Sequence, residues 1–136
     1  TRAEKQLYRY GAAAVPYLLP VSRSRFDLSR IAALRVLLKS PRYEAVPAAL
    51  AGLQAENRWV RKLSWQLIEK ISGIRSSFPW EEKDLSGLRR KKARIWQSWH
   101  QQQERLRLQE QQRLRELEKK QDQAEESSES TAKAGR

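Results

Sequence analysis

The sequence predicts an all-α fold, a short stack of helical hairpins closed by a long C-terminal helix that ends in a polar tail. The stretch Ala14-Val15-Pro16 recurs as Ala45-Val46-Pro47 at an offset of 31 residues, and Arg30 recurs as Arg61 at the same offset. Apolar residues within each copy follow helical spacing, and a long run rich in charged residues follows the second copy. Two separate landmarks at one offset indicate a structural repeat.

The predicted organisation has four parts, which are repeats over 1–73, a linker over 74–87, a long helix over 88–122 and a disordered tail over 123–136. Residues 1–11 are expected to form a partial or capping helix that ends at Gly11, since glycine commonly terminates helices. At the same offset Leu7 falls on Leu38, which belongs to the second helix of a repeat. We therefore expect either upstream repeats or a short cap.

The first predicted repeat covers 12–40. Its first helix runs from Ala12 to Val21, tolerates Pro16 in its first turn and is broken by Pro20 and the Ser-Arg-Ser-Arg that follows at 22–25. Either Asp27 or Ser29 is expected to cap the second helix. That helix carries a wide apolar arc, which predicts packing against helices on two sides.

The second predicted repeat covers 41–73. Asn57 is expected to be the N-cap of its second helix, which ends at Ser72-Gly73. The first helix presents apolar residues at i, i+4 and i+7, and the second presents a longer inward set. These residues are Val46, Leu50 and Leu53 in the first helix, and Val60, Leu63, Leu67, Ile68 and Ile71 in the second.

These segments resemble the short HEAT repeats common in bacterial proteins. The pattern Gly-x-x-Ala-Val-Pro-x-Leu covers 11–18, an arginine with small apolar residues follows at 30–34, and the second copy has Ala-Val-Pro at 45–47 and Trp-Val-Arg-Lys-Leu at 59–63. Two departures are Arg42, where the repeat expects glycine, and the turn before Asn57, which lacks the usual aspartate. The resemblance covers 3–73 and implies a short α-solenoid. HEAT arrays are similar to one another mainly as protein-binding scaffolds, so function still has to be argued from a site.

The linker and the long helix carry the predicted closure of the stack. Phe78-Pro79-Trp80 is expected to fold back on the last repeat as an aromatic clip, while Glu81, Glu82 and Asp84 are interpreted as solvated loop charges. Leu88, Ile95 and Trp99 share one helical face, which predicts docking on the repeats. Beyond Trp99 the heptad fails, so we expect an exposed helix and no sustained coiled coil. Ion pairs are expected along it, namely Glu104 with Arg107, Glu110 with Arg113, and Glu116 with Lys119 and Lys120.

The aromatic residues receive separate predictions. Trp65 is expected in the core, and Trp59 on an exposed edge where an aromatic anchor would suit a partner. One of Trp96 and Trp99 is expected to pack under the linker, because a single apolar face does not bury both. His100, the only histidine, is expected on the exposed side of its helix.

The composition argues against catalysis and against metal or cofactor binding by this chain. Cysteine is absent, one histidine is present, and neither a phosphate-binding loop nor a nucleophile elbow occurs. We therefore expect a non-enzymatic protein with no catalytic, metal-binding or cofactor-binding residues. No apolar run is long enough to span a bilayer, so we expect a soluble chain that is either cytoplasmic or exported with its signal already removed.

The formal net charge of +12 favours anionic partners, although a well-solvated arginine-rich surface explains it equally well. The leading hypothesis is a protein-interaction or assembly scaffold, and the alternative is a nucleic-acid-binding module with a basic face. Arg30 and Arg61 are interpreted mainly as ties between helices. Candidate partner-binding residues are Arg58, Trp59, Lys62, Arg89, Arg90, Lys91 and Lys92, and the nucleic-acid alternative adds Arg61 to the cations that contact phosphates.

Overall fold

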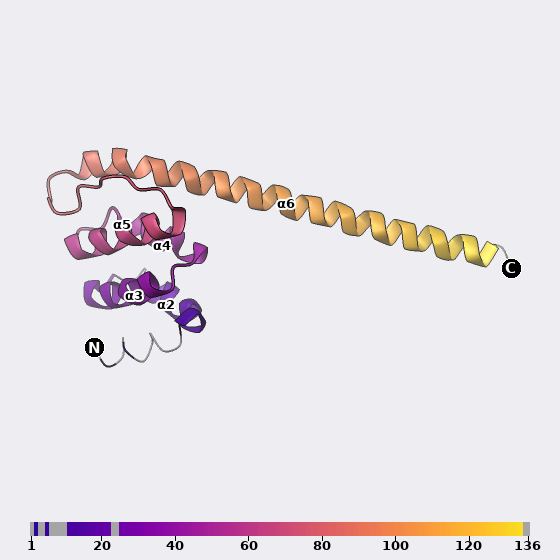
Figure 1. Ribbon diagram of the computed structural model, residues 1–136, viewed down its shortest axis with the longest axis horizontal. Helices are drawn as coiled ribbons and strands as arrows, with labels where there is room; N and C mark the ends of the chain where they lie inside the picture. The colour runs from indigo at the N-terminus through magenta and orange to yellow at the C-terminus, as the bar shows by residue number, and fades with distance from the viewer. Residues whose placement is uncertain (1, 3–4, 6–10, 23–24, 135–136) are drawn as a thin grey trace. The chain divides into compact units, whose positions relative to one another are not determined.

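The computed structural model describes residues 2, 5, 11–22 and 25–134, and every secondary-structure element among them is a helix (Figure 1). The all-α prediction is confirmed. The partial helix expected over 1–11 lies almost wholly outside the described residues. The elements are the 3-10 helices η1 (Gly11–Ala14) and η2 (Tyr43–Ala45) and the α-helices α2 (Val15–Ser22), α3 (Asp27–Lys39), α4 (Val46–Gly52), α5 (Arg58–Ser72) and α6 (Ser86–Ala134). The chain divides into two compact units, Thr1–His100 and Gln101–Arg136.

Within the first unit, α3 and α5 lie side by side and run in the same direction. At their N-terminal ends Asn57 Nδ2 donates to Asp27 Oδ2 at 3.5 Å, and at their C-terminal ends Lys70 Nζ donates to the Leu38 carbonyl at 3.3 Å. Figure 1 shows the pair α2 and α3 and the pair α4 and α5 in successive layers. The two hairpins therefore have the same orientation, as the offset of 31 residues predicts.

The helix ends of the two hairpins differ. Asn57 caps α5 as predicted, because its side-chain oxygen accepts from the backbone N–H groups of Trp59 at 2.9 Å and Val60 at 3.2 Å. Gly73 ends α5 at a φ of 72°, a conformation that favours glycine. The cap predicted for α3 is wrong. Phe26 occupies the cap position without a side-chain hydrogen bond, while Asp27 is already helical and its carboxylate faces Asn57.

The first helix predicted from Ala12 to Val21 corresponds to η1 and α2. Pro20 does not interrupt α2, which ends at Ser22, the first residue of the Ser-Arg-Ser-Arg stretch that was predicted to break it. Ser22 is buried, and its hydroxyl donates to the Leu19 carbonyl at 2.7 Å, which keeps the last turn closed. Arg30 Nε then donates to the Ser22 carbonyl at 3.0 Å, so this arginine ties α3 to the end of α2 as predicted.

Close contact between α4 and α5 depends on a glycine. A Cβ added at Gly52 would lie 1.8 Å from Ser64 Oγ and 2.7 Å from Ser64 Cβ, so no larger residue fits there without movement. The apolar core runs through both hairpins and continues into Phe78 of the linker and Ala93 and Trp96 of α6.

The linker packs on the repeats as an aromatic clip. Phe78 is buried and meets Trp96 edge-on at 6.2 Å between ring centroids, and Trp96 Nε1 donates to the Ile74 carbonyl at 3.1 Å. Trp96 is thus the tryptophan that lies under the linker. Trp99 is half-buried and meets Tyr43 edge-on at 5.9 Å. Trp65 is half-buried against the core.

His100 is not on an exposed face. Its Nδ1 forms a hydrogen bond with the Tyr43 hydroxyl at 3.0 Å, and its side chain is half-buried. The prediction failed because Tyr43, far upstream in the chain, supplies a polar partner that helix periodicity does not reveal.

The docking face of α6 also differs from the prediction. Leu88 and Ile95 are exposed, and the buried residues are Arg89, Ala93 and Trp96, which follow the i, i+4, i+7 spacing of one helical face. The prediction used the spacing of apolar residues alone, so it did not place an arginine on the buried face. Arg89 is accommodated there because backbone carbonyls of the linker accept its hydrogen bonds.

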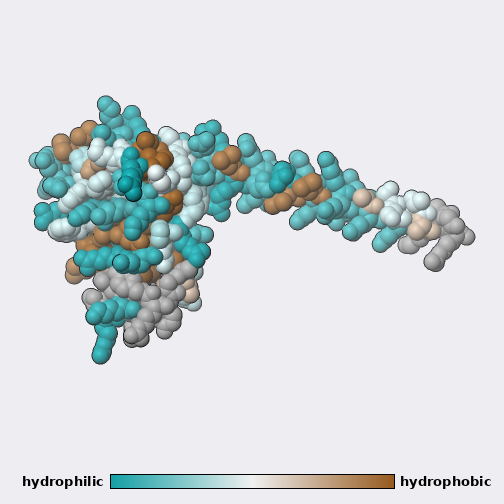
Figure 2. Space-filling model, viewed as in Figure 1, coloured by the Kyte–Doolittle hydropathy of each residue, from teal (hydrophilic) through white to brown (hydrophobic). Residues whose placement is uncertain are grey.

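The second unit, Gln101–Arg136, is helical through Ala134, so the disordered tail predicted over 123–136 is wrong for residues 123–134. The segment is rich in glutamine, glutamate, arginine and leucine, all of which favour helix. Two of the expected ion pairs form, Glu104 with Arg107 at 3.6 Å and Glu110 with Arg113 at 2.7 Å. Figure 2 shows this part as mostly hydrophilic with a few apolar positions. Its exposed large apolar residues are Leu106, Leu108, Leu114 and Leu117.

Candidate binding groove

An open groove with a volume of about 630 Å³ lies between α3 and α5. Each helix contributes four lining residues, and the two sets occupy equivalent positions at the offset of 31 residues. The α3 set is Leu28, Ile31, Ala32 and Arg35, and the α5 set is Trp59, Lys62, Leu63 and Gln66. The groove is therefore built by the repeat itself.

Each wall follows the i, i+3, i+4, i+7 spacing of one helical face, which spans about two turns or roughly 10 Å. Large apolar side chains of both walls reach solvent, with Leu28 85% exposed and Trp59 45% exposed. Ala32 leaves room between them because its side chain is small. Apolar surface gathered in a groove in this way is typical of a binding site.

Cations and tryptophans alternate at the N-terminal end of the groove. Arg58 Cζ lies 4.9 Å from the centroid of Trp59, and Lys62 Nζ lies 5.6 Å from the centroid of Trp59 and 4.8 Å from that of Trp80. The two tryptophan centroids are 6.0 Å apart. Trp80 of the linker thus holds the Lys62 ammonium against the rim of the groove.

Three of the predicted partner-binding residues gather here. Trp59 and Lys62 line the groove, and Arg58 stacks on Trp59 at its rim. The exposure predicted for Trp59 is confirmed.

Arg61 does not belong to this surface, although the nucleic-acid alternative uses it. Its side chain is 2% exposed and donates to the carbonyls of Ala55 at 2.9 Å, Glu56 at 2.6 Å and Trp80 at 2.9 Å. Burial lowers the pKa of its guanidinium, and the nearby charge of Arg89 lowers it further. Arg61 therefore joins the interhelical turn to the linker, as its structural interpretation predicts.

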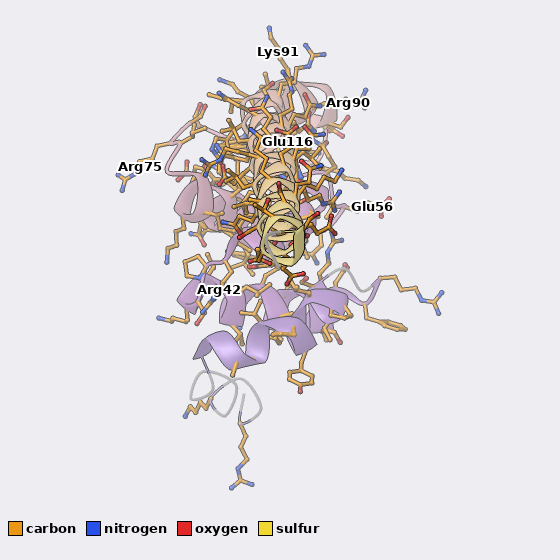
Figure 3. All side chains as sticks on the ribbon, turned by 90° about the vertical axis from the view of Figure 1, so that its right-hand side faces the viewer. Arg42, Glu56, Arg75, Arg90, Lys91 and Glu116 are labelled. Carbon is orange, nitrogen blue, oxygen red and sulfur yellow. The ribbon has the colours of Figure 1, made fainter. Side chains whose placement is uncertain are left out.

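The predicted basic run at the start of α6 is divided by the fold. Arg89 is 5% exposed and donates to the carbonyls of Pro79, Glu82 and Lys83, so it is not a surface cation. Lys92 is half-buried beside Ser77, with Nζ 3.5 Å from Oγ. Arg90 and Lys91 are exposed and extend away from the helix (Figure 3).

The aliphatic part of the groove was not predicted. Leu63 was assigned to the inward set of its helix, whereas it borders the groove together with Leu28 and Ile31. The offset of 31 residues carried the signal, because it aligns Leu28 with the exposed Trp59. The offset alone does not show which face of each helix is turned toward solvent.

The part of the chain that the structure describes contains no group of three or more His, Cys, Asp or Glu residues able to hold a metal ion. Among the same residues, no helix is both long and apolar enough to cross a membrane. Comparison with known proteins found no family model, no curated protein and no solved structure that matches this chain.

Proposed function

We propose that this protein is a non-enzymatic interaction module, a short α-solenoid of HEAT type, which binds a segment of another protein in the groove between α3 and α5. The observation that carries the proposal is the pair of equivalent, solvent-facing helical stripes that form the groove. Leu28 and Trp59 expose apolar surface that hydrophobic contact with a partner would remove from water.

The rim supports the same role. Trp59 is an amphipathic aromatic side chain at the mouth of a groove, and tryptophan and arginine are the residues most enriched among those that dominate binding energy. Arg58 and Lys62 are already ordered against tryptophan rings, so little side-chain entropy is lost when a partner binds.

Binding of nucleic acid is the weaker alternative. Arg61 and Arg89 are buried with backbone carbonyl partners, so two of the cations that it requires do not face solvent. Arg90 and Lys91 are exposed, but neither of them lines the groove.

Site-specific photocrosslinking tests the proposal. A photoreactive amino acid replaces Leu28 in the full chain and, as a matched control, Leu108, another exposed leucine. We expect a discrete polypeptide adduct from position 28, absent from position 108 and strongly reduced by Trp59→Ala. Equal adducts from both positions, an adduct insensitive to Trp59→Ala, or a nuclease-sensitive adduct at position 28 would each contradict the proposal.

A further inference from the structure

The lining of the groove has a definite charge. Lys62 and Arg35 are its two cations, and none of its eight residues is acidic. Arg58 adds a third positive charge where it stacks on Trp59. The remaining lining residues are apolar except Gln66. The surface therefore combines aliphatic and aromatic contact area with a basic rim.

From this combination we infer that the groove recognises an acidic, apolar-anchored peptide, in which large apolar side chains are flanked by aspartate or glutamate. The inference rests on the proposed function and specifies its ligand. Apolar anchors bury Leu28, Ile31 and Leu63, and the flanking carboxylates neutralise Arg58 and Lys62.

Lys62 is the residue that favours a carboxylate of the peptide at one defined position of the groove. Its ammonium lies between the rings of Trp59 and Trp80, at 5.6 Å and 4.8 Å from their centroids. The rings orient the lysine but carry no net charge, so its positive charge is not neutralised by them. A carboxylate that reaches this position gains a charge-assisted hydrogen bond to a group that is already ordered.

The length of the groove limits how many residues of the partner it can contact. Two helical turns of wall accommodate about two turns of a bound helix, or roughly three residues of extended chain. Two apolar anchors and their immediate acidic neighbours fill such a site. Larger affinity would require contacts beyond it.

A single-stranded nucleic acid shares the negative charge but fits the walls less well. Its bases bind by stacking on aromatic faces, and Trp59 is the one aromatic residue among the eight that line the groove. Leu28, Ile31 and Leu63 match leucine-like or isoleucine-like anchors of a peptide more closely than a base.

Selection from a random-peptide library against the full chain tests the inference. We expect enrichment of peptides with aspartate or glutamate beside large apolar residues. Affinity of the enriched peptides, measured by fluorescence anisotropy, should fall at least about tenfold in Arg58→Glu/Lys62→Glu. The matched double variant Arg90→Glu/Lys91→Glu changes the same charge at exposed residues outside the groove and should leave the affinity nearly unchanged.

Other outcomes separate the two proposals. Leu28→Asp should abolish binding, while Leu108→Asp should not; peptide binding that survives Leu28→Asp overturns both the inference and the proposed groove. Loss with Leu28→Asp but not with Arg58→Glu/Lys62→Glu overturns only the acidic preference. Enrichment of neutral or basic peptides also overturns the acidic preference. Binding of oligothymidine to the full chain that is lost in Leu28→Asp overturns it as well, because the groove would then bind a nucleic acid. Circular dichroism and unfolding midpoints confirm that each variant is folded.

Discussion

Arg61 and Arg89 donate to adjacent carbonyls of the linker, with Arg61 Nε 2.9 Å from the Trp80 oxygen and Arg89 Nη1 3.4 Å from the Pro79 oxygen. Burial lowers the pKa of the Arg61 guanidinium, and repulsion by the nearby buried guanidinium of Arg89 lowers it further. The linker carbonyls compensate for that repulsion. By fixing Trp80, the same hydrogen bonds place an aromatic ring against Lys62 at the rim of the groove.

Arg61→Gln should destabilise the protein by about 2 to 4 kcal/mol, because it removes the charge-assisted hydrogen bonds that the buried guanidinium donates to three backbone carbonyls. Chemical denaturation monitored by circular dichroism measures the change. Arg58→Gln, an exposed arginine three residues earlier, is the control and should alter stability by less than about 0.5 kcal/mol. Equal effects of the two substitutions would show that the carbonyl contacts of Arg61 contribute little.

Gly52→Ala should destabilise the protein by about 1 to 3 kcal/mol, since the added methyl group overlaps Ser64 and forces α4 away from α5. Gly87→Ala is the matched control. No atom lies within 4 Å of a Cβ at Gly87, so alanine there should be neutral or stabilise α6 by up to about 1 kcal/mol. A stabilising Gly52→Ala would contradict the close packing of the two helices.

The tryptophans should separate into structural and binding residues. Trp96→Ala removes a fully buried ring and the hydrogen bond to Ile74, and we expect a loss of about 3 to 5 kcal/mol in unfolding free energy. Trp59→Ala should cost less than about 1 kcal/mol, because the side chain is 45% exposed. Thermal and chemical unfolding of both variants check the difference, and a reversed order would refute the assignment.

Asn57→Ala should destabilise α5 by about 1 kcal/mol, because the N–H groups of Trp59 and Val60 lose their acceptor. Asn57→Ser retains a capping oxygen and should recover most of the loss. Because the cap also contacts Asp27, the comparison includes Asp27→Ala, which should cost less than Asn57→Ala. Amide exchange in the first turn of α5 gives a local measure of the same effect.

The fold was largely predictable because its signals are local or periodic. The offset of 31 residues located both hairpins, and Asn57 and Gly73 marked the ends of α5 through their own backbone chemistry. The aromatic clip and the burial of one tryptophan beneath it also followed from composition. The length of α6 was underestimated, because its C-terminal residues favour helix while having no apolar face to indicate it.

The site was only partly predictable, because it depends on contacts between distant segments. Trp59, Lys62 and Arg58 were identified from residue type, but Arg89 was misassigned because a cation at a helix start suggested an external partner. Its partners are three carbonyls of the preceding loop, and no residue pattern reveals the path of that loop. His100 was misplaced for the same reason, since its partner Tyr43 lies far upstream, in the second repeat.

The most direct test of the groove is a fluorine NMR titration of the full chain labelled with 5-fluorotryptophan. The five tryptophans give five resonances, which single substitutions by phenylalanine assign. On addition of an enriched acidic peptide, the resonances of Trp59 and Trp80 should shift while that of the buried Trp96 stays in place. Saturating peptide that leaves the Trp59 resonance unchanged would contradict binding in the groove between α3 and α5.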